Sequence, residues 1–236
     1  MEGLKIASIY GLKPHELGFC GPQIAVKQQI LRGFILGRVS NNEVRVVLQK
    51  FEGAYPYYQL IASNNGIADP FDENVVRAYW IGNELLDKVN IQDLRRTIIE
   101  KFSYPGLLPK EIAVEKAQAI LENAKPHHSL HVYVIGSVTG KVDLNDLSAK
   151  DLCRVSWGKV LEIKDKKIVV EYQPIVGDKV LQLGEAKKKE VLWDKEILPS
   201  VKINDQISFH WNLAIQILTA EDIKNLQKYT FQNISG

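Results

Sequence analysis

Two residues in the second half of the chain, Cys153 and His210, are of the types that bind transition metals. A thiolate is a soft donor and a neutral imidazole is a borderline donor, and both suit iron. A free thiol with a pKa near 8.5 is mostly protonated at neutral pH, so a bound metal or a nearby cation must favour the thiolate. The alternative is structural: Cys153 is a small core side chain, and His210 lies on the polar face of a strand.

Joint ligation makes a geometric demand on these two residues. Sulfur and nitrogen ligands about 2.3 and 2.1 Å from one metal lie about 3–4 Å apart, and roughly twice as far apart in an empty site. We therefore expect both side chains at one mouth of a barrel. A separation of more than about 12 Å excludes joint ligation without a large rearrangement.

A second set of candidate residues lies in the first 136 residues. Cys20 sits in a Gly-flanked turn ahead of a predicted helix, where the helix N-terminus lowers a thiol pKa. His127, His128 and His131 form a His-His-x-x-His pattern, which together with a distant cysteine can bind a metal but matches no standard zinc module. A capping or core role is the alternative for these histidines. Glu52, between Phe51 and Gly53, is either a buried acid or an ordinary helix residue.

The elements that carry these residues change character along the chain. Residues 1–136 are predicted to form an α-helical domain, with a clear amphipathic helix capped by Asn90 and another from Lys110 to Ala124. The β-branched segment from His131 to Gly136 is typical of a strand. A polar connector at 136–150 is expected to hold the domain boundary.

Short alternating segments dominate the second domain, at 151–236. Five strands are predicted, at 153–163, 167–175, 179–183, 188–193 and 205–211. Thr219, with Asp222 three residues later, indicates the start of a closing helix. The predicted fold is therefore α+β, with an all-α domain followed by a small OB-like β-barrel and a C-terminal helix.

Composition limits the class of function. The chain has 30 Lys and Arg against 28 Asp and Glu, a net charge of +2, which argues against a nucleic-acid partner. An OB-type nucleic-acid binder also needs exposed aromatic side chains in a basic groove. Apolar stretches fall short of the ~20 residues that span a membrane. The first residues have no secretory pattern, so we expect a cytoplasmic protein with free thiols.

Residues 151–231 resemble the HypC/HupF hydrogenase assembly chaperones. The resemblance lies in Cys153-Arg154-Val155-Ser156-Trp157-Gly158-Lys159-Val160, and in the later segment from Asn204 to Ile215 that carries His210 before Ala214. The segments at 16–22, 52–58, 66–70 and 126–128 resemble an uncharacterised bacterial family associated with [NiFe]-hydrogenase gene clusters. The chain departs from the chaperones because Cys153 is internal, because Trp157 replaces a proline, and because Asn212 replaces a glycine.

This resemblance implies an accessory chaperone or adaptor in [NiFe]-hydrogenase maturation, which is not itself an enzyme. Its implied partner is the hydrogenase large subunit or a HypD-like scaffold protein. Its implied cargo is an Fe(CN)2CO precursor on Cys153 and His210, with Trp157, Trp211 and Glu52 as candidate binding residues. The alternative is a metal-handling enzyme or redox protein that acts on the ligands of the iron through Cys20, Glu52 and the three histidines.

Overall fold

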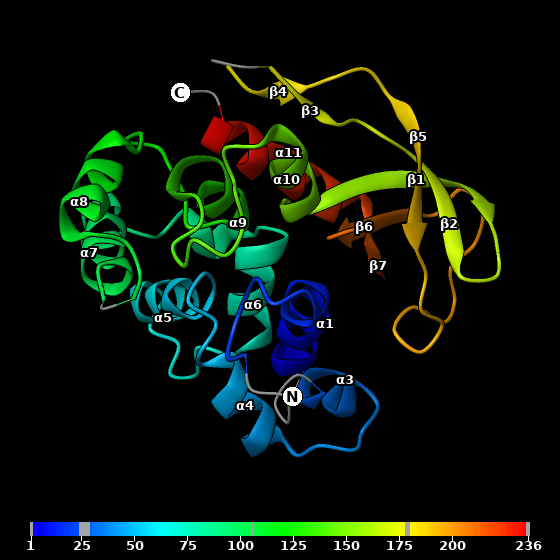
Figure 1. Cartoon of the computed structure of the whole chain (residues 1–236), viewed down its shortest axis with the longest axis horizontal. Coiled ribbons are helices and arrows are strands. Elements are labelled where there is room, and N and C mark those ends of the chain that lie inside the picture. Colours follow the sequence, from blue (N-terminus) through cyan, green and yellow to red (C-terminus); the bar gives the residue numbers. More distant parts are fainter. Residues whose placement is uncertain (1, 24–28, 105, 178–179, 235–236) are drawn as a thin grey trace.

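The computed structural model describes residues 2–23, 29–104, 106–177 and 180–234, and has the α+β fold that the sequence predicts. Helices come first, a closed five-stranded barrel follows, and a long helix ends the described chain. Figure 1 shows most of the helices gathered on one side and the barrel on the other. No helix in these described ranges combines the length and apolar character needed to span a membrane.

The helical part consists mostly of short helices, and its first helix, α1, is buried along most of its length. These helices are α1 (Glu2–Glu16), α3 (Ile30–Ile35), α4 (Asn41–Leu48), α5 (Tyr55–Asn64), α6 (Glu73–Trp80), η1 (Glu84–Leu86), α7 (Ile91–Phe102), α8 (Lys110–Ala119), α9 (His128–Leu130), η2 (His131–Ile135) and α10 (Leu147–Cys153). Helix α1 packs against α3, α4 and α6. The helix expected after Pro22 falls partly on residues 24–28, which are outside the described residues.

Local capping signals place several helix ends correctly. The Asn90 side chain accepts a hydrogen bond from the Gln92 amide at the start of α7, as predicted. Helix α8 begins at Lys110 as predicted but ends at Ala119 rather than at Ala124. The Arg95 guanidinium donates to the carbonyl oxygens of Ala117 and Ile120, at 3.3 and 3.2 Å, and so satisfies backbone acceptors at this helix end.

The prediction of a strand at His131–Gly136 is wrong. Residues His131–Ile135 form η2, a single π-helical turn that continues α9. Val132 and Ile135 are fully buried, and Gly136 ends the turn with a φ of 77°. Because this segment packs inside the helical part, tertiary burial decides its backbone and overrides the β propensity of the valines.

The barrel is made of β1 (Ser156–Ile163), β2 (Lys167–Tyr172), β5 (Lys187–Leu192), β6 (Gln206–His210) and β7 (Leu213–Ile217). They close in the order β1-β2-β5-β7-β6, with β6 paired to β1. All neighbouring strands are antiparallel except β5 and β7, which pair in parallel. This is the five-stranded closed barrel that the alternating pattern predicts.

Two details of the strand prediction are corrected. Residues 182–183 form β4, which pairs with β3 (Ile175–Val176) in a separate two-stranded sheet, and the fifth barrel strand is β7. Cys153 is the last residue of α10 and not the first residue of a barrel strand. The turn Trp211-Asn212, with both φ values positive, lets the chain return from β6 to β7, so that β6 is not the last strand.

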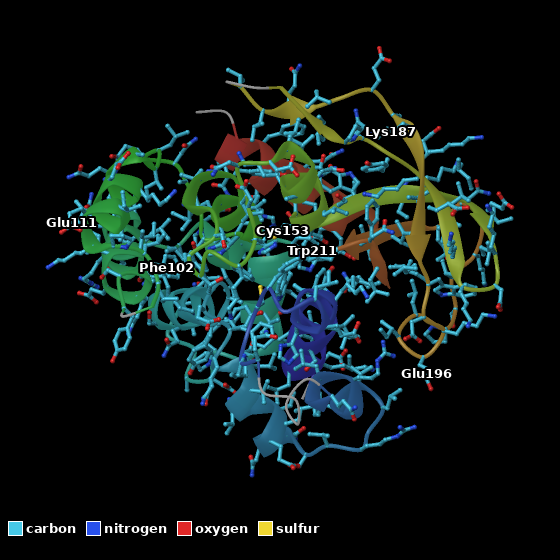
Figure 2. All side chains as sticks on the ribbon, viewed as in Figure 1. Phe102, Glu111, Cys153, Lys187, Glu196 and Trp211 are labelled. Atoms are coloured by element: carbon cyan, nitrogen blue, oxygen red, sulfur yellow. The ribbon has the colours of Figure 1, made fainter. Side chains whose placement is uncertain are left out.

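The largest cluster of buried side chains joins the helical part to the barrel, because it contains Tyr10 and Trp80 from helices and Leu213 from the barrel. The barrel interior forms a separate hydrophobic cluster. The Tyr10 hydroxyl lies 2.8 Å from the Ser208 hydroxyl, which links α1 to β6. Helix α11 (Ala220–Ile234) packs against α9 and η2. Figure 2 places Cys153 and Trp211 near this junction, whereas Lys187 and Glu196 lie at the outer side of the barrel.

Candidate metal centre

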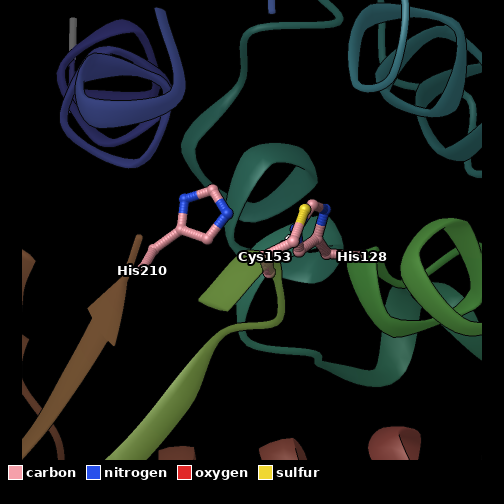
Figure 3. A group of neighbouring side chains, drawn as sticks. All are labelled: His128, Cys153 and His210. Carbon is pink, nitrogen blue, oxygen red and sulfur yellow. Dashed lines mark hydrogen bonds between the residues drawn. The ribbon is translucent and has the colours of Figure 1, made fainter. Parts of the chain in front are cut away.

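Three buried side chains of metal-binding type meet at the junction of helices and barrel. They are His128 at the start of α9, Cys153 at the end of α10 and His210 at the end of β6. One ligand atom from each lies within 4.8 Å of the others. Figure 3 shows His210 approaching from the barrel and the other two from the helical side. The distance condition for joint ligation by Cys153 and His210 is therefore met, while ligation itself stays a prediction.

The His210 imidazole has one nitrogen fixed and one available. Its Nδ1 lies 2.8 Å from the Tyr10 carbonyl oxygen, which can only accept, so Nδ1 carries the proton. Its Nε2 is buried and makes no hydrogen bond. The ring packs at 5.4 Å from the Trp80 ring and 5.1 Å from the His128 ring, which restricts its rotation. A backbone carbonyl that orients an imidazole in this way is typical of metal-binding histidines.

The His128 imidazole is hydrogen-bonded through both of its nitrogens. Its Nε2 lies 2.8 Å from the Cys153 carbonyl oxygen, and its Nδ1 lies 2.9 Å from the Tyr79 hydroxyl, which also contacts the Gly53 carbonyl. With the proton on Nε2, His128 donates to Cys153. A metal can bind Nε2 only if the proton moves to Nδ1, from which it is donated to the Tyr79 oxygen, and the ring turns away from the Cys153 carbonyl.

Burial sets the protonation of all three groups. Desolvation lowers the pKa of His210 to about 4. The carbonyl oxygens of Tyr10 and Cys153 favour the protonated ring and oppose this effect. Desolvation also lowers the pKa of His128 well below its usual value, with a further contribution from His210. Desolvation raises the pKa of the Cys153 thiol and Cys20 adds to this, whereas the Trp211 indole N–H, which forms no hydrogen bond within the described part of the chain, opposes it. At neutral pH the imidazoles are therefore neutral and ready to bind, whereas the thiol must lose a proton.

A small, partly enclosed cavity of about 40 Å³ lies against the three residues. Side chains from distant parts of the chain form its walls, among them Phe19, Phe51, Val142 and Leu144. Polar groups also reach it: Cys20, Glu52, His131 and Trp211. The two residue sets that the sequence analysis treated as separate alternatives, one in the barrel and one in the helical part, therefore border one space.

The pKa expectation for Cys20 is wrong. Burial raises the pKa of its thiol to about 12, and the negative charge of Glu52 adds to this effect. The expected helix N-terminus lies among residues outside the described ranges. Cys20 is therefore protonated at neutral pH and is not an activated thiol.

The remaining predicted residues divide into structural and cavity-lining groups. His127 accepts a hydrogen bond from the Ser129 amide at the start of α9, which is a capping role, and does not line the cavity. His131 lines the cavity, with Nδ1 3.4 Å from the Tyr57 hydroxyl. Trp157 is half-buried on β1 and is not among the cavity residues. The Arg154 guanidinium carbon lies over its ring, 5.6 Å from the ring centre.

Sequence reasoning missed the groups that orient the metal-type donors. The Tyr10 carbonyl and the Tyr79 hydroxyl hold His210 and His128, across 200 and 49 positions of the chain. No sequence signal marks either tyrosine, because each looks like an ordinary apolar position in a helix. Of the three neighbouring histidines, only His128 joins the cluster with Cys153 and His210. Its contacts with these two residues, which lie far away in the sequence, decide this.

Neither the curated proteins nor the solved structures contain a match to this chain. One family description matches residues 1–235, so it covers the helical part and the barrel together. The chain belongs to this family, DUF6390, a family of unknown function.

Proposed function

We propose that the protein is an accessory protein for [NiFe]-hydrogenase assembly that holds a transition metal, iron by resemblance, between its helical part and its barrel. One observation carries the proposal: ligand atoms of His128, Cys153 and His210 lie within 4.8 Å of one another in a buried site. The hydrogenase context comes from the resemblance of residues 151–231 to HypC/HupF chaperones. The proposed partner is the hydrogenase large subunit or the scaffold that builds its iron centre.

The donor set suits iron. One thiolate and two neutral imidazoles combine a soft donor with two borderline donors. Ligand atoms about 2.0–2.3 Å from one ion lie about 3.3–3.8 Å apart in tetrahedral geometry, so the three donors must close by about 1 Å on binding. Side-chain rotation of Cys153 and release of the His128 bond to the Cys153 carbonyl provide that movement. His210, whose Nε2 has no other partner, needs no exchange of hydrogen bonds.

Metal binding by the purified protein tests the site. We expect anaerobic protein to bind one Fe(II) ion, and Cys153→Ala or His210→Ala to weaken binding at least a hundredfold while the protein stays folded. Replacing a small buried cysteine with alanine costs only about 1 kcal/mol. His127→Asn is the matched control, because this histidine is buried outside the cluster and asparagine retains a capping oxygen. Unchanged iron binding by both site variants would remove the proposed centre.

The hydrogenase context requires a separate experiment in native cells. We expect tagged protein, isolated without oxygen, to retain a hydrogenase large subunit or the iron-centre scaffold. A strain that carries only Cys153→Ala is expected to lose hydrogenase activity. Normal hydrogenase activity in that strain would reduce Cys153 to a packing residue.

The second candidate function is a metal-handling enzyme or redox protein that acts on the ligands of the iron. It is favoured by one observation, that Cys20, Glu52 and His131 of the helical part line the cavity beside the three donors. Cys20→Ala separates the two candidates. Loss of maturation with iron binding intact favours the second candidate, whereas normal maturation favours the first.

A further inference from the structure

The three-donor site leaves room for a ligand that the protein does not supply. Among the described residues, the cluster of His, Cys, Asp and Glu donors contains only His128, Cys153 and His210. Cys20 and Glu52 line the adjoining cavity but do not belong to that cluster. Metal sites with three protein donors usually keep a further position for a small molecule, whereas structural sites are closed by four protein ligands.

Glu52 brings an unsatisfied acceptor to this cavity. Its Oε2 atom is buried and has no hydrogen-bond partner. A buried carboxylate oxygen without a donor is costly, and native structures rarely keep one without a ligand, an ion or a water. The backbone around it is held in place, because the carbonyl of the next residue, Gly53, accepts from Tyr79. The carboxylate is therefore available to a guest molecule in the cavity.

Size and charge restrict what that guest can be. A cavity of about 40 Å³ holds a molecule of about three non-hydrogen atoms or fewer. A Glu52 carboxylate and a metal-bound Cys153 thiolate both place negative charge at a site with few polar walls, which disfavours an added anion. A small neutral molecule with a lone pair for the metal and a hydrogen for Glu52 fits both conditions.

Resting on the proposed metal site, we propose that the cavity binds a small neutral hydrogen-bond donor as a further ligand of the metal, with Glu52 accepting its hydrogen bond. The metal coordinates the lone pair of the guest, and Glu52 selects for the hydrogen on the other side. Glu52 thus favours small neutral ligands over free anions of the same size.

Two probes of similar size and opposite character test this selection on the Co(II)-loaded protein. Hydrazine, used at a pH where it is unprotonated, is a small neutral donor, and azide is a small anion. Binding of either probe to the metal changes the visible absorption of Co(II), which gives a dissociation constant without any activity assay. We expect the native protein to bind hydrazine at least tenfold more tightly than azide.

Glu52→Gln removes the negative charge at nearly constant shape. We expect it to bind azide at least tenfold more tightly than the native protein does, and hydrazine more weakly. Glu52→Asp retains the charge and is expected to keep azide excluded, which guards against effects of local repacking. Glu122→Gln is the matched control, because this side chain is exposed on the surface, bound to Arg95, and away from the cavity.

The outcomes separate this inference from the proposed function. If the protein binds Co(II) through Cys153 but neither probe changes the absorption, the coordination sphere is closed. This result overturns the inference and leaves the proposed function standing. The inference is also overturned if the ratio of the two dissociation constants, for hydrazine and azide, differs by less than twofold between the native protein and Glu52→Gln. Failure of the native protein to bind Co(II) or Fe(II) at all rejects the metal site itself, and with it the proposed function.

Discussion

Acidification should destabilise this protein steeply, because it buries histidines that stay neutral in the folded state. Burial lowers the pKa of His127 to about 3 and of His131 and His210 to about 4, and lowers the pKa of His128 well below its usual value. In the unfolded chain each imidazole has a pKa near 6.5. Below pH 6.5 the unfolded state therefore binds protons that the folded state does not.

The sign and size follow from proton linkage. A lowered folded-state pKa means that stability is fully present above about pH 6.5 and is lost as the pH falls toward about 4. Between pH 7.5 and 5.5 each such histidine removes about 1.3 kcal/mol from the free energy of unfolding, and four remove about 5 kcal/mol. That loss is comparable to the whole stability of a marginal domain, which is about 5–15 kcal/mol.

Urea unfolding at pH 7.5, 6.5 and 5.5, without added metal, measures this loss. We expect the midpoint to fall steadily with pH, and His131→Gln to reduce the pH-dependent loss by about 1.3 kcal/mol, since it removes one of the four groups. A total loss below about 2 kcal/mol between pH 7.5 and 5.5 would refute the reasoning. It would mean that the imidazoles accept protons while folded, and that the site is open to water.

Two further predictions concern packing at the junction and the surroundings of the thiol. Gly82→Ala should lower the free energy of unfolding by about 2–4 kcal/mol, because φ is +98° and a Cβ would lie 2.2 Å from the Tyr229 ring of α11. Gly66→Ala is its control, with a φ of +65° and open space, and should cost only about 1 kcal/mol in urea unfolding. Trp211→Phe should weaken metal binding about tenfold in chelator competition, because it removes a buried indole N–H that has no hydrogen-bond partner among the described residues and favours the Cys153 thiolate. Equal affinity in this variant would show that Trp211 only packs at the site.

Local sequence determined the elements whose causes are themselves local. The capping side chain of Asn90 starts α7, and the reciprocal bonds between Thr219 and Asp222 start α11, as their spacing predicts. Alternation of apolar side chains likewise predicts a barrel, since period two places Val160, Ile207 and Phe209 in its interior. These signals act within a few residues, so the chain reveals them before it folds.

Tertiary structure decided the elements and the site that depend on distant partners. His131–Ile135 has the residues of a strand but forms a π-helical turn, because burial in the helical part outweighs β propensity. The sequence named Cys153 and His210 as possible partners but not the geometry that brings them together. Cys153 ends a helix, and His210 is held by the carbonyl of Tyr10, 200 positions away. Contacts between segments so distant in sequence exist only once α1, α10 and β6 have packed together, and no local pattern encodes them.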